Sequence, residues 1–342
     1  MININKLVRE NVANMKAYSS ARSEFSGLDG VFLDANENPY NNGVNRYPDP
    51  YQRSLKKKIA EIKAIDEQKI MLGNGSDEVL DLLFRAFCEP KQDNVIVTTP
   101  SYGMYGVLAN LNNVELKNVQ YEADFSLDVD KIIAAVDDNT KMIILCSPNN
   151  PTGNVIEKSV VENILLNTNC IVIVDEAYID FTEKESFINS LNNYNQLVVS
   201  QTLSKYYGMA GIRLGMCFAN EEIIAILNKI KPPYNVNVLT QNIAIDLLNS
   251  YNGTYKKEVI EQRNLLSNEI RKLTFVEKVY PSDANFILVK TKDANYIYKT
   301  LLDKNIIVRN RTKEVLCENC IRITIGTPHE NEKLINALKE IK

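Results

Sequence analysis

The sequence predicts an α/β protein whose central sheet is largely parallel and sandwiched by helices. Apolar, β-branched runs recur through the middle of the chain and alternate with segments of helical periodicity. Hydrophobicity within each run is continuous rather than alternating, which is typical of strands buried on both faces. The runs are Asn94–Thr98, Lys141–Cys146, Cys170–Asp175, Gln196–Ser200 and Gly215–Ala219.

A helix is predicted directly after the turn Gly73-Asn-Gly75. Ser76 can cap its N-terminus, and the apolar stripe that follows ends at about Cys88. The stripe consists of Val79, Leu80, Leu82, Leu83, Ala86 and Phe87. It is wide enough for the helix to pack against the sheet.

A smaller α+β domain is predicted for the last part of the chain, after the boundary at Pro232-Pro233. A helical segment from about Leu239 to Leu273 carries a break near Asn252-Gly253, and shorter strands then alternate with helices. These strands are Asn285–Lys290, Ile306–Arg309 and Cys320–Ile325. The first thirty residues are polar and weakly periodic, which favours an arm. We expect an arm at 1–30, a large domain at 31–235 and a small domain at 236–342.

Composition excludes several classes of protein. The chain has 342 residues, 45% hydrophobic and 24% charged, which is ordinary for a globular protein with room for two domains. The net charge of −4 comes without long runs of one sign, so a nucleic-acid or membrane surface is not indicated. Met1–Lys6 lacks the apolar core of a signal peptide, and no apolar stretch approaches the roughly 20 residues that span a bilayer. We expect a cytoplasmic protein with small-molecule ligands.

Cysteine and histidine usage argues against a metal site. Six cysteines are present, and four of them lie in apolar or strand-like settings, which fits a reducing compartment. Cys317-Glu-Asn-Cys320 has the spacing of a metal or redox pair, but it lacks a second ligand pair and precedes a strand rather than opening a helix. The only histidine is His329. A Ser-His-Asp hydrolase therefore has little support.

A lysine between small polar residues and a Gly-rich turn is the strongest candidate for covalent chemistry. This residue is Lys205, in the run Thr202–Arg213, and its amine can condense with an aldehyde. Asp175 ends a buried strand, where open α/β sheets place ligand groups. Asn150 and Tyr178 can both donate hydrogen bonds to an oxygen. Taken singly, such residues are most often a surface lysine, a helix cap, a turn asparagine and a core aromatic.

Their order along the chain indicates a pyridoxal phosphate site. That cofactor needs an amine, an acid under its pyridine nitrogen, donors for its phenolate oxygen and a cradle for its phosphate. A helix start with backbone N–H groups, a hydroxyl and a guanidinium can form the cradle, and an aromatic ring can stack on the pyridine. We assign the cradle to Gly75, Ser76, Asp77, Thr202, Ser204 and Arg213, the stacking ring to Tyr102, and the catalytic roles to Lys205, Asp175 and Tyr178.

Across nearly its full length the chain resembles the fold-type I pyridoxal phosphate aminotransferases, and within them the histidinol-phosphate aminotransferase family. The opening pair Asp34-Ala-Asn-Glu-Asn-Pro39 and Arg46-Tyr-Pro-Asp-Pro50 narrows the resemblance to this family. Further matching runs are Tyr18–Arg22, Gly75–Glu78, the Asn150 loop, Val174–Tyr178, Thr202–Lys205 and Ala210–Gly215. Two departures are Tyr206-Tyr207, where the family often has a small residue and Phe, and the extra Asn74-Gly75 in the phosphate turn.

The resemblance implies a homodimer with shared active sites and a ping-pong reaction between L-glutamate and imidazole-acetol phosphate, a step of histidine biosynthesis. Tyr47 would reach the phosphate of the cofactor in the partner subunit. Arg322 would bind the substrate α-substituent, and Arg309, Tyr18 and Tyr234 would surround the substrate phosphate. An amide group at position 37 and the Asn150 amide complete the set of residues expected to bind the substrate.

Several alternatives stay open on the sequence. A threonine-phosphate decarboxylase or an aromatic-amino-acid aminotransferase would share the cofactor residues. A non-catalytic regulator of this fold would need a DNA-binding module, which the chain has no spare length to hold. A dinucleotide-binding oxidoreductase is disfavoured because Gly73-Asn-Gly75-Ser-Asp-Glu78 lacks the third glycine of that fingerprint.

Overall fold

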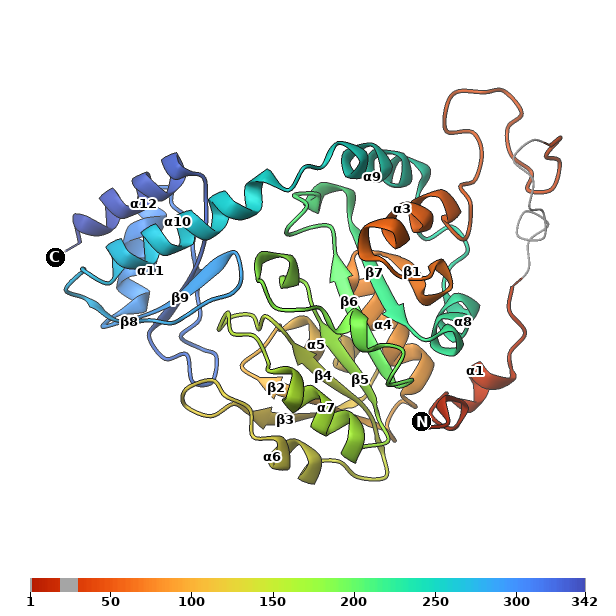
Figure 1. Ribbon diagram of the computed structural model, residues 1–342, viewed down its shortest axis with the longest axis horizontal. Helices are drawn as coiled ribbons and strands as arrows, with labels where there is room; N and C mark the ends of the chain where they lie inside the picture. The colour runs from red at the N-terminus through yellow and green to blue at the C-terminus, as the bar shows by residue number, and fades with distance from the viewer. Residues whose placement is uncertain (1, 19–29, 342) are drawn as a thin grey trace.

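A computed structural model describes residues 2–18 and 30–341, and it contains two separate sheets (Figure 1). The larger sheet has seven strands in the order β1-β7-β6-β5-β4-β2-β3. Neighbours among β2 to β6 are parallel, whereas β7 runs antiparallel to both β6 and β1. The strands are β1 (Ile70–Asn74), β2 (Asn94–Thr99), β3 (Glu115–Gln120), β4 (Thr140–Cys146), β5 (Ile171–Asp175), β6 (Leu197–Thr202) and β7 (Leu214–Ala219).

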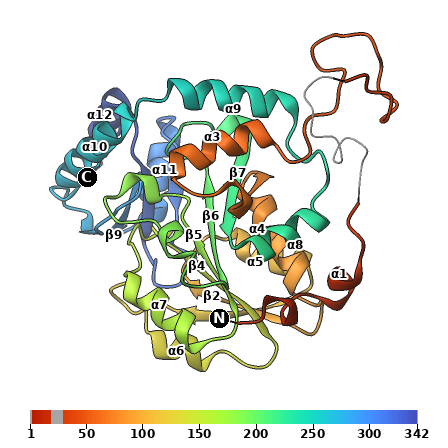
Figure 2. The same ribbon diagram turned by 45° about the vertical axis from the view of Figure 1, so that its right-hand side comes forward.

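Helices cover both faces of the large sheet, as predicted (Figure 2). One face packs against α4 (Ser76–Phe87), α5 (Met104–Leu111) and α8 (Glu221–Ile230). The other face packs against α3 (Arg53–Lys63), α6 (Val129–Ala134), α7 (Lys158–Asn167) and α9 (Val238–Ser250). Successive residues of β5 alternate between the two cores, which is why its sequence is apolar throughout.

The smaller sheet is antiparallel, in the order β10-β11-β9-β8. One face packs against α10 (Thr254–Ile270), α11 (Ala294–Asp303) and α12 (Pro328–Lys339). The other face, through Leu288 and Phe286, contacts aromatic residues that belong to the larger unit. The strands are β8 (Val276–Val279), β9 (Phe286–Thr291), β10 (Arg309–Asn310) and β11 (Cys320–Thr324).

Several local predictions are confirmed and others are wrong. The expected break lies between α9 and α10, where Gly253 adopts a positive φ of 70°. The strand expected at 306–309 is reduced to Arg309–Asn310, because only these residues pair with β11. Strands β1 and β3 were not expected; β3 lies at the sheet edge and is polar. The boundary at 235/236 stays a prediction, and α9, which follows it, packs against the large sheet.

The N-terminal segment lies against the large unit. Ile4 is fully buried, and α1 (Glu10–Asn14) lies beside α8. The Arg9 N–H donates to the Ala86 carbonyl at 3.0 Å, and its guanidinium pairs with Glu89. Tyr18 is 71% exposed. The rest of the run Tyr18–Arg22 lies outside the described residues.

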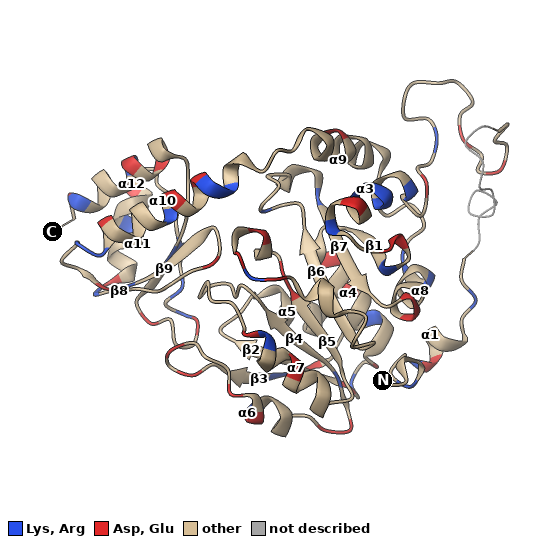
Figure 3. Cartoon of the chain, viewed as in Figure 1, with Lys and Arg blue, Asp and Glu red and all other residues tan. Residues whose placement is uncertain are grey.

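All six cysteines are free and buried. Cys317 and Cys320 lie together in the apolar cluster beneath the small sheet. Among the described residues, no group of three or more His, Cys, Asp or Glu side chains could hold a metal ion. In the same ranges, no helix is long and apolar enough to cross a membrane. Charges of both signs are distributed over the two units (Figure 3).

Candidate active site

A cavity opens where β4, β5 and β6 end and α4 begins. This is the edge at which the carboxyl ends of parallel strands gather ligand groups. Almost every residue that the sequence placed around the cofactor lines it. The lining consists of Ser76, Asp77, Tyr102, Cys146, Asn150, Asp175, Ala177, Tyr178, Thr202, Ser204, Lys205 and Arg213.

The carboxylate of Asp175 is almost fully buried in the cavity wall, with 3% of the residue exposed. It ends β5 and accepts a hydrogen bond from the Tyr105 hydroxyl at 2.7 Å and one from the Ala177 N–H at 3.2 Å. Burial raises the pKa of Asp175 to about 6, although the Tyr105 hydrogen bond opposes the rise. A cationic ring nitrogen beside this carboxylate would restore its charge.

Lys205 follows β6 and exposes its amine to the cavity. Its Nζ lies 5.8 Å from the centre of the Tyr178 ring. Desolvation and the positive charges of Arg322 and Arg213 lower the pKa of Lys205. A lysine with a lowered pKa has a larger fraction of neutral, nucleophilic amine, which is what condensation with an aldehyde requires.

Asn150 and Tyr178 flank this amine. Asn150 is buried, and its Oδ1 accepts a hydrogen bond from the Arg322 guanidinium. That bond uses the amide oxygen, so the Asn150 NH₂ group remains as a donor toward the cavity. The Tyr178 ring packs edge to face on Phe286 at 5.1 Å, and burial raises the pKa of its hydroxyl, which stays protonated as a donor.

The part of the cavity at the start of α4 is suited to hold an anion. The first turn of α4 presents the N–H groups of Ser76 and Asp77 beside the Arg213 guanidinium, 3.8 Å from the Asp77 carboxylate. Ser204 Oγ is buried and has no hydrogen-bond partner within the described ranges. Gly215 is required here, because a Cβ atom would lie 2.2 Å from the Ser76 nitrogen. β7 therefore packs directly on the start of α4.

Tyr102 forms the remaining wall. Its hydroxyl donates to Asp77 Oδ1 at 3.3 Å, and its ring meets Tyr105 edge to face at 5.6 Å. Burial and the neighbouring Asp77 raise the pKa of Tyr102 to about 12. The Asp77 carboxylate thus has two partners, the Tyr102 hydroxyl and the Arg213 guanidinium.

Two of the predicted site residues, one assigned to the cofactor phosphate and one to the substrate, stack on each other outside the cavity. The Tyr47 and Tyr234 rings lie 4.4 Å apart and nearly parallel, and Tyr47 is 49% exposed. Arg309 pairs across the small sheet with Arg322, so both guanidinium groups lie on one face. Arg322 reaches the cavity through Asn150, whereas Arg309 is exposed.

The expected amide at position 37 is wrong. This residue is Glu37, and its carboxylate pairs with Arg46 at 2.8 Å and accepts the Tyr47 N–H. A buried carboxylate beside an arginine forms an ion pair, which an amide cannot do. The residue holds the Arg46-Tyr47 segment in place, and the asparagines of the run are Asn36 and Asn38.

Sequence reasoning missed two lining residues of the cavity and one residue behind its wall. Tyr105, which is buried and bonds Asp175, lies three residues after Tyr102, and this spacing was the only available signal. Cys146 and Ala177 line the cavity as neighbours of strand ends. Neither carries a chemical signature in the sequence.

The donor set fits pyridoxal phosphate. A buried carboxylate can pair with a ring nitrogen, and a lysine with lowered pKa lies within the same cavity. Unpartnered Ser204 Oγ, among the described residues, and the start of α4 can receive a phosphate. The carboxylate, the lysine and the anion-binding helix start all line this one cavity.

Comparison with known proteins identifies the family of the chain. The family model for aminotransferase class I and II matches residues 28–338, and the chain belongs to this family. A histidinol-phosphate aminotransferase of Flavobacterium johnsoniae is 55% identical over 341 residues, with 98% of each chain covered. One of Parabacteroides distasonis is 52% identical, with all of both chains covered.

Solved structures agree with the fold. The histidinol-phosphate aminotransferase of Clostridium acetobutylicum superposes with a TM-score of 0.79 at 28% identity, covering 87% of this chain and 91% of that one. The enzyme of the same name from Sinorhizobium meliloti, solved in complex with pyridoxal-5'-phosphate, gives a TM-score of 0.77 at 25% identity and covers 86% and 82%. The predicted fold-type I architecture is confirmed.

Proposed function

We propose that the chain is a pyridoxal phosphate-dependent aminotransferase that moves an amino group between L-glutamate and imidazole-acetol phosphate, giving 2-oxoglutarate and L-histidinol phosphate. The carrying observation is the placement of Lys205 and Asp175 in one cavity with an anion-binding helix start. Two histidinol-phosphate aminotransferases that are 55% and 52% identical to this chain over nearly its whole length support this particular substrate. The reaction is a step of histidine biosynthesis.

The cofactor supplies an electron sink for the electrons released when a proton leaves the substrate Cα. Asp175 would hold the ring nitrogen protonated, since an adjacent cation restores the charge of a carboxylate whose pKa burial has raised. Lys205 would hold the cofactor through its amine and, as a free amine during turnover, would carry the proton as general acid and base. Asn150 and Tyr178 would donate to the phenolate oxygen and orient the ring.

The remaining residues hold the two anionic ends. Backbone N–H groups at Gly75, Ser76 and Asp77, with the side chains of Thr202, Ser204 and Arg213, bind the cofactor phosphate, and Tyr102 stacks on the ring. On the substrate side, Arg322 pairs with the carboxylate of glutamate, because its planar fork can make two parallel hydrogen bonds. Arg309, Tyr18 and Tyr234 surround the phosphate of the other substrate.

The decisive assay supplies purified protein with L-histidinol phosphate and 2-oxoglutarate, and separately with threonine phosphate or phenylalanine. We expect glutamate to form with the first pair at a kcat/KM well above that with phenylalanine. Release of carbon dioxide from threonine phosphate would assign the chain to the decarboxylases instead. Equal rates with phenylalanine would assign it to aromatic aminotransferases.

We propose a cytoplasmic homodimer in which each active site is shared. An exposed apolar stripe on α9, made of Leu239, Ile243 and Leu247, lies beside Val44 and Tyr47, which are also exposed. Apolar side chains at i, i+4 and i+8 on one helix face are typical of an interface. A second copy on this face would bring Tyr47 to the partner's cofactor phosphate.

Mixing two inactive variants tests the shared site. Lys205→Ala lacks the amine, and Tyr47→Ala lacks the phosphate contact offered across the interface. If each site combines Lys205 of one subunit with Tyr47 of the other, a hybrid dimer has one intact site. Co-refolding equal amounts should restore about a quarter of wild-type activity, since half of the dimers are then hybrids. The mixture should stay inactive if Tyr47 serves its own subunit.

A further inference from the structure

We propose that Glu176 is a positioning residue that fixes the two strand ends carrying Asp175 and Lys205, acting from the side opposite the cavity. The inference rests on the proposed function, because it concerns how the cofactor residues are held. It assigns a role to a buried carboxylate that the reaction itself does not use.

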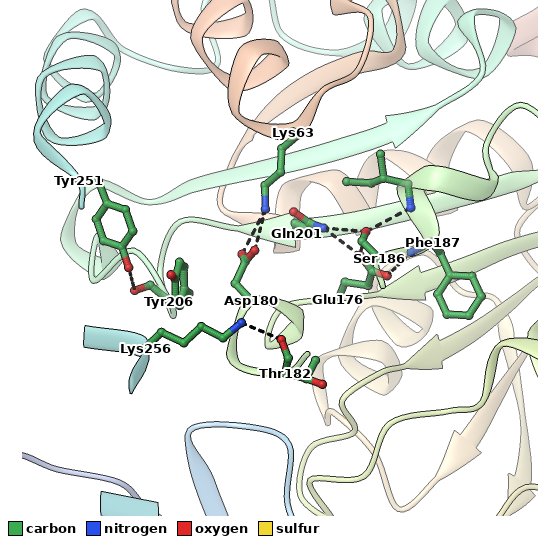
Figure 4. A network of polar contacts seen from close by, with 11 residues as sticks. Lys63, Glu176, Asp180, Thr182, Ser186, Phe187, Gln201, Tyr206, Tyr251 and Lys256 are labelled. Atoms are coloured by element: carbon green, nitrogen blue, oxygen red, sulfur yellow. Dashed lines mark hydrogen bonds and ion pairs between the residues drawn. The ribbon is translucent and has the colours of Figure 1, made fainter. Parts of the chain in front are cut away.

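The Glu176 carboxylate is saturated with donors from two other segments (Figure 4). The residue is 1% exposed. Its Oε1 accepts the Phe187 N–H at 2.7 Å, and its Oε2 accepts both the Gln201 Nε2 at 2.8 Å and the Ser186 hydroxyl. Its own N–H donates to the Ser200 carbonyl at 2.8 Å, which continues the pairing of β5 with β6. One side chain therefore joins the end of β5, the end of β6 and the loop that enters Phe187.

Alternation along the strands explains the link to the cavity. Asp175 and Thr202 line the cavity, whereas their neighbours Glu176 and Gln201 meet on the other face of the sheet. Glu176 and Gln201, which bond each other, therefore lie at the strand ends from which the chain continues to Tyr178 and to Lys205, respectively. A shift of Glu176 relative to Gln201 changes the separation of Asp175 and Lys205, and a misplacement of about 1 Å can cost about 100-fold in rate.

The hydrogen bonds, rather than the charge, are what the network requires. Lys63 of α3 is the lysine whose charge acts on Glu176, but its Nζ pairs with Asp180 at 2.9 Å. The three donors to Glu176 are neutral, and burial raises its pKa to about 7. Gln201 Oε1 has no partner within the described chain. With glutamine at position 176, the Gln201 amide could flip so that its oxygen accepts a hydrogen bond from the NH₂ group of the new side chain.

This distinction gives a matched pair of variants. Glu176→Gln should keep the cofactor dissociation constant and kcat within about 3-fold of wild type, because the hydrogen bonds can be rebuilt. Glu176→Ala should weaken cofactor binding about 10-fold and lower kcat by about 10- to 100-fold, with the KM for L-glutamate little changed. The visible absorbance of the cofactor bound to Lys205, titrated with pH, should shift its midpoint in Glu176→Ala only.

Thr140→Val is the control for a general loss of stability. Its hydroxyl is also buried and bonds Asn94 and Asp137, but it lies at the opposite end of β4. The absorbance titration of this variant should match that of wild type. If Glu176→Ala does not fold, Gln201→Met removes the amide donor alone and should weaken cofactor binding about 3- to 10-fold.

Two results would overturn the proposal. One is a folded Glu176→Ala or Gln201→Met variant with wild-type cofactor binding and titration. The other is equal impairment of Glu176→Gln and Glu176→Ala, because the charge would then be what matters. Wild-type protein is measured first: the proposed function fails if L-histidinol phosphate and 2-oxoglutarate are not the preferred pair, whereas this proposal fails only on the cofactor binding and absorbance titration of the variants.

Discussion

Lys205→Ala is expected to lower turnover by at least about 10⁴-fold while the protein stays folded. The substitution removes both the covalent attachment and the group that moves the proton, each of which contributes orders of magnitude. The side chain makes no hydrogen bond or ion pair with another described residue of the chain, so its removal leaves the fold intact. Cofactor should still bind through Arg213, Ser204 and Asp175.

The measurement combines steady-state rates with borohydride trapping and mass spectrometry. Wild type should carry a pyridoxyl adduct on Lys205, and the variant should carry none. Lys256→Ala is a suitable control, because that lysine lies outside the cavity and bonds the Thr182 carbonyl at 2.8 Å. An adduct on another lysine of the wild-type protein would show that the reactive amine has been misassigned.

Asp175→Asn is expected to lower kcat by about 10²- to 10³-fold. An amide keeps the shape and can still accept from Tyr105, but it cannot hold a ring nitrogen protonated, and one preorganised charge is worth roughly this factor. Single-turnover rates with L-glutamate would measure the loss. Tyr105→Phe, which keeps the carboxylate, should lose much less. Equal losses in both variants would mean that the buried hydrogen bond, and not the charge, carries the effect.

Asp175→Asn should also be more stable than wild type in the cofactor-free state. Burial raises the pKa of Asp175 to about 6, so the folded protein binds this proton more tightly than the unfolded chain does. Its stability therefore falls as pH rises from about 4 to 6. Two pKa units correspond to about 3 kcal/mol, and asparagine removes this loss. Denaturant unfolding at pH 4 and 7.5 should show that the excess free energy of unfolding of Asp175→Asn over wild type grows with pH, to at most about 3 kcal/mol.

Much of the fold and of the cofactor end of the site could be predicted from the sequence. Continuous apolar runs identified the strands that are buried on both faces. Asp175 ends one of these strands and Lys205 follows the neighbouring one, so the sheet brings the two side chains together. The edge strand β3 was missed because its pattern is polar, and β1 because it contains Gly73. Short edge strands carry little periodic signal.

Contacts that depend on tertiary packing could not be predicted. Tyr105 was indistinguishable from a core aromatic until α5 placed its hydroxyl on Asp175. The link from Arg322 to Asn150 joins residues 172 positions apart, one in strand β11 and the other in the loop after β4. Glu37 lies inside the quoted run Asp34–Pro39, but its ion pair with Arg46 could be seen only in the structure.

Because all six thiols are buried, their reaction with an alkylating reagent would report transient opening of the folded structure. A thiol reacts as the thiolate, and an apolar environment suppresses that form, as the raised pKa values of Cys88, Cys146, Cys170 and Cys217 show. Alkylation of native protein should therefore proceed only through transient exposure. Cys146 also lines the cavity, so its protection against reagent should rise when the cavity is filled, while that of Cys217 follows unfolding of the sheet alone.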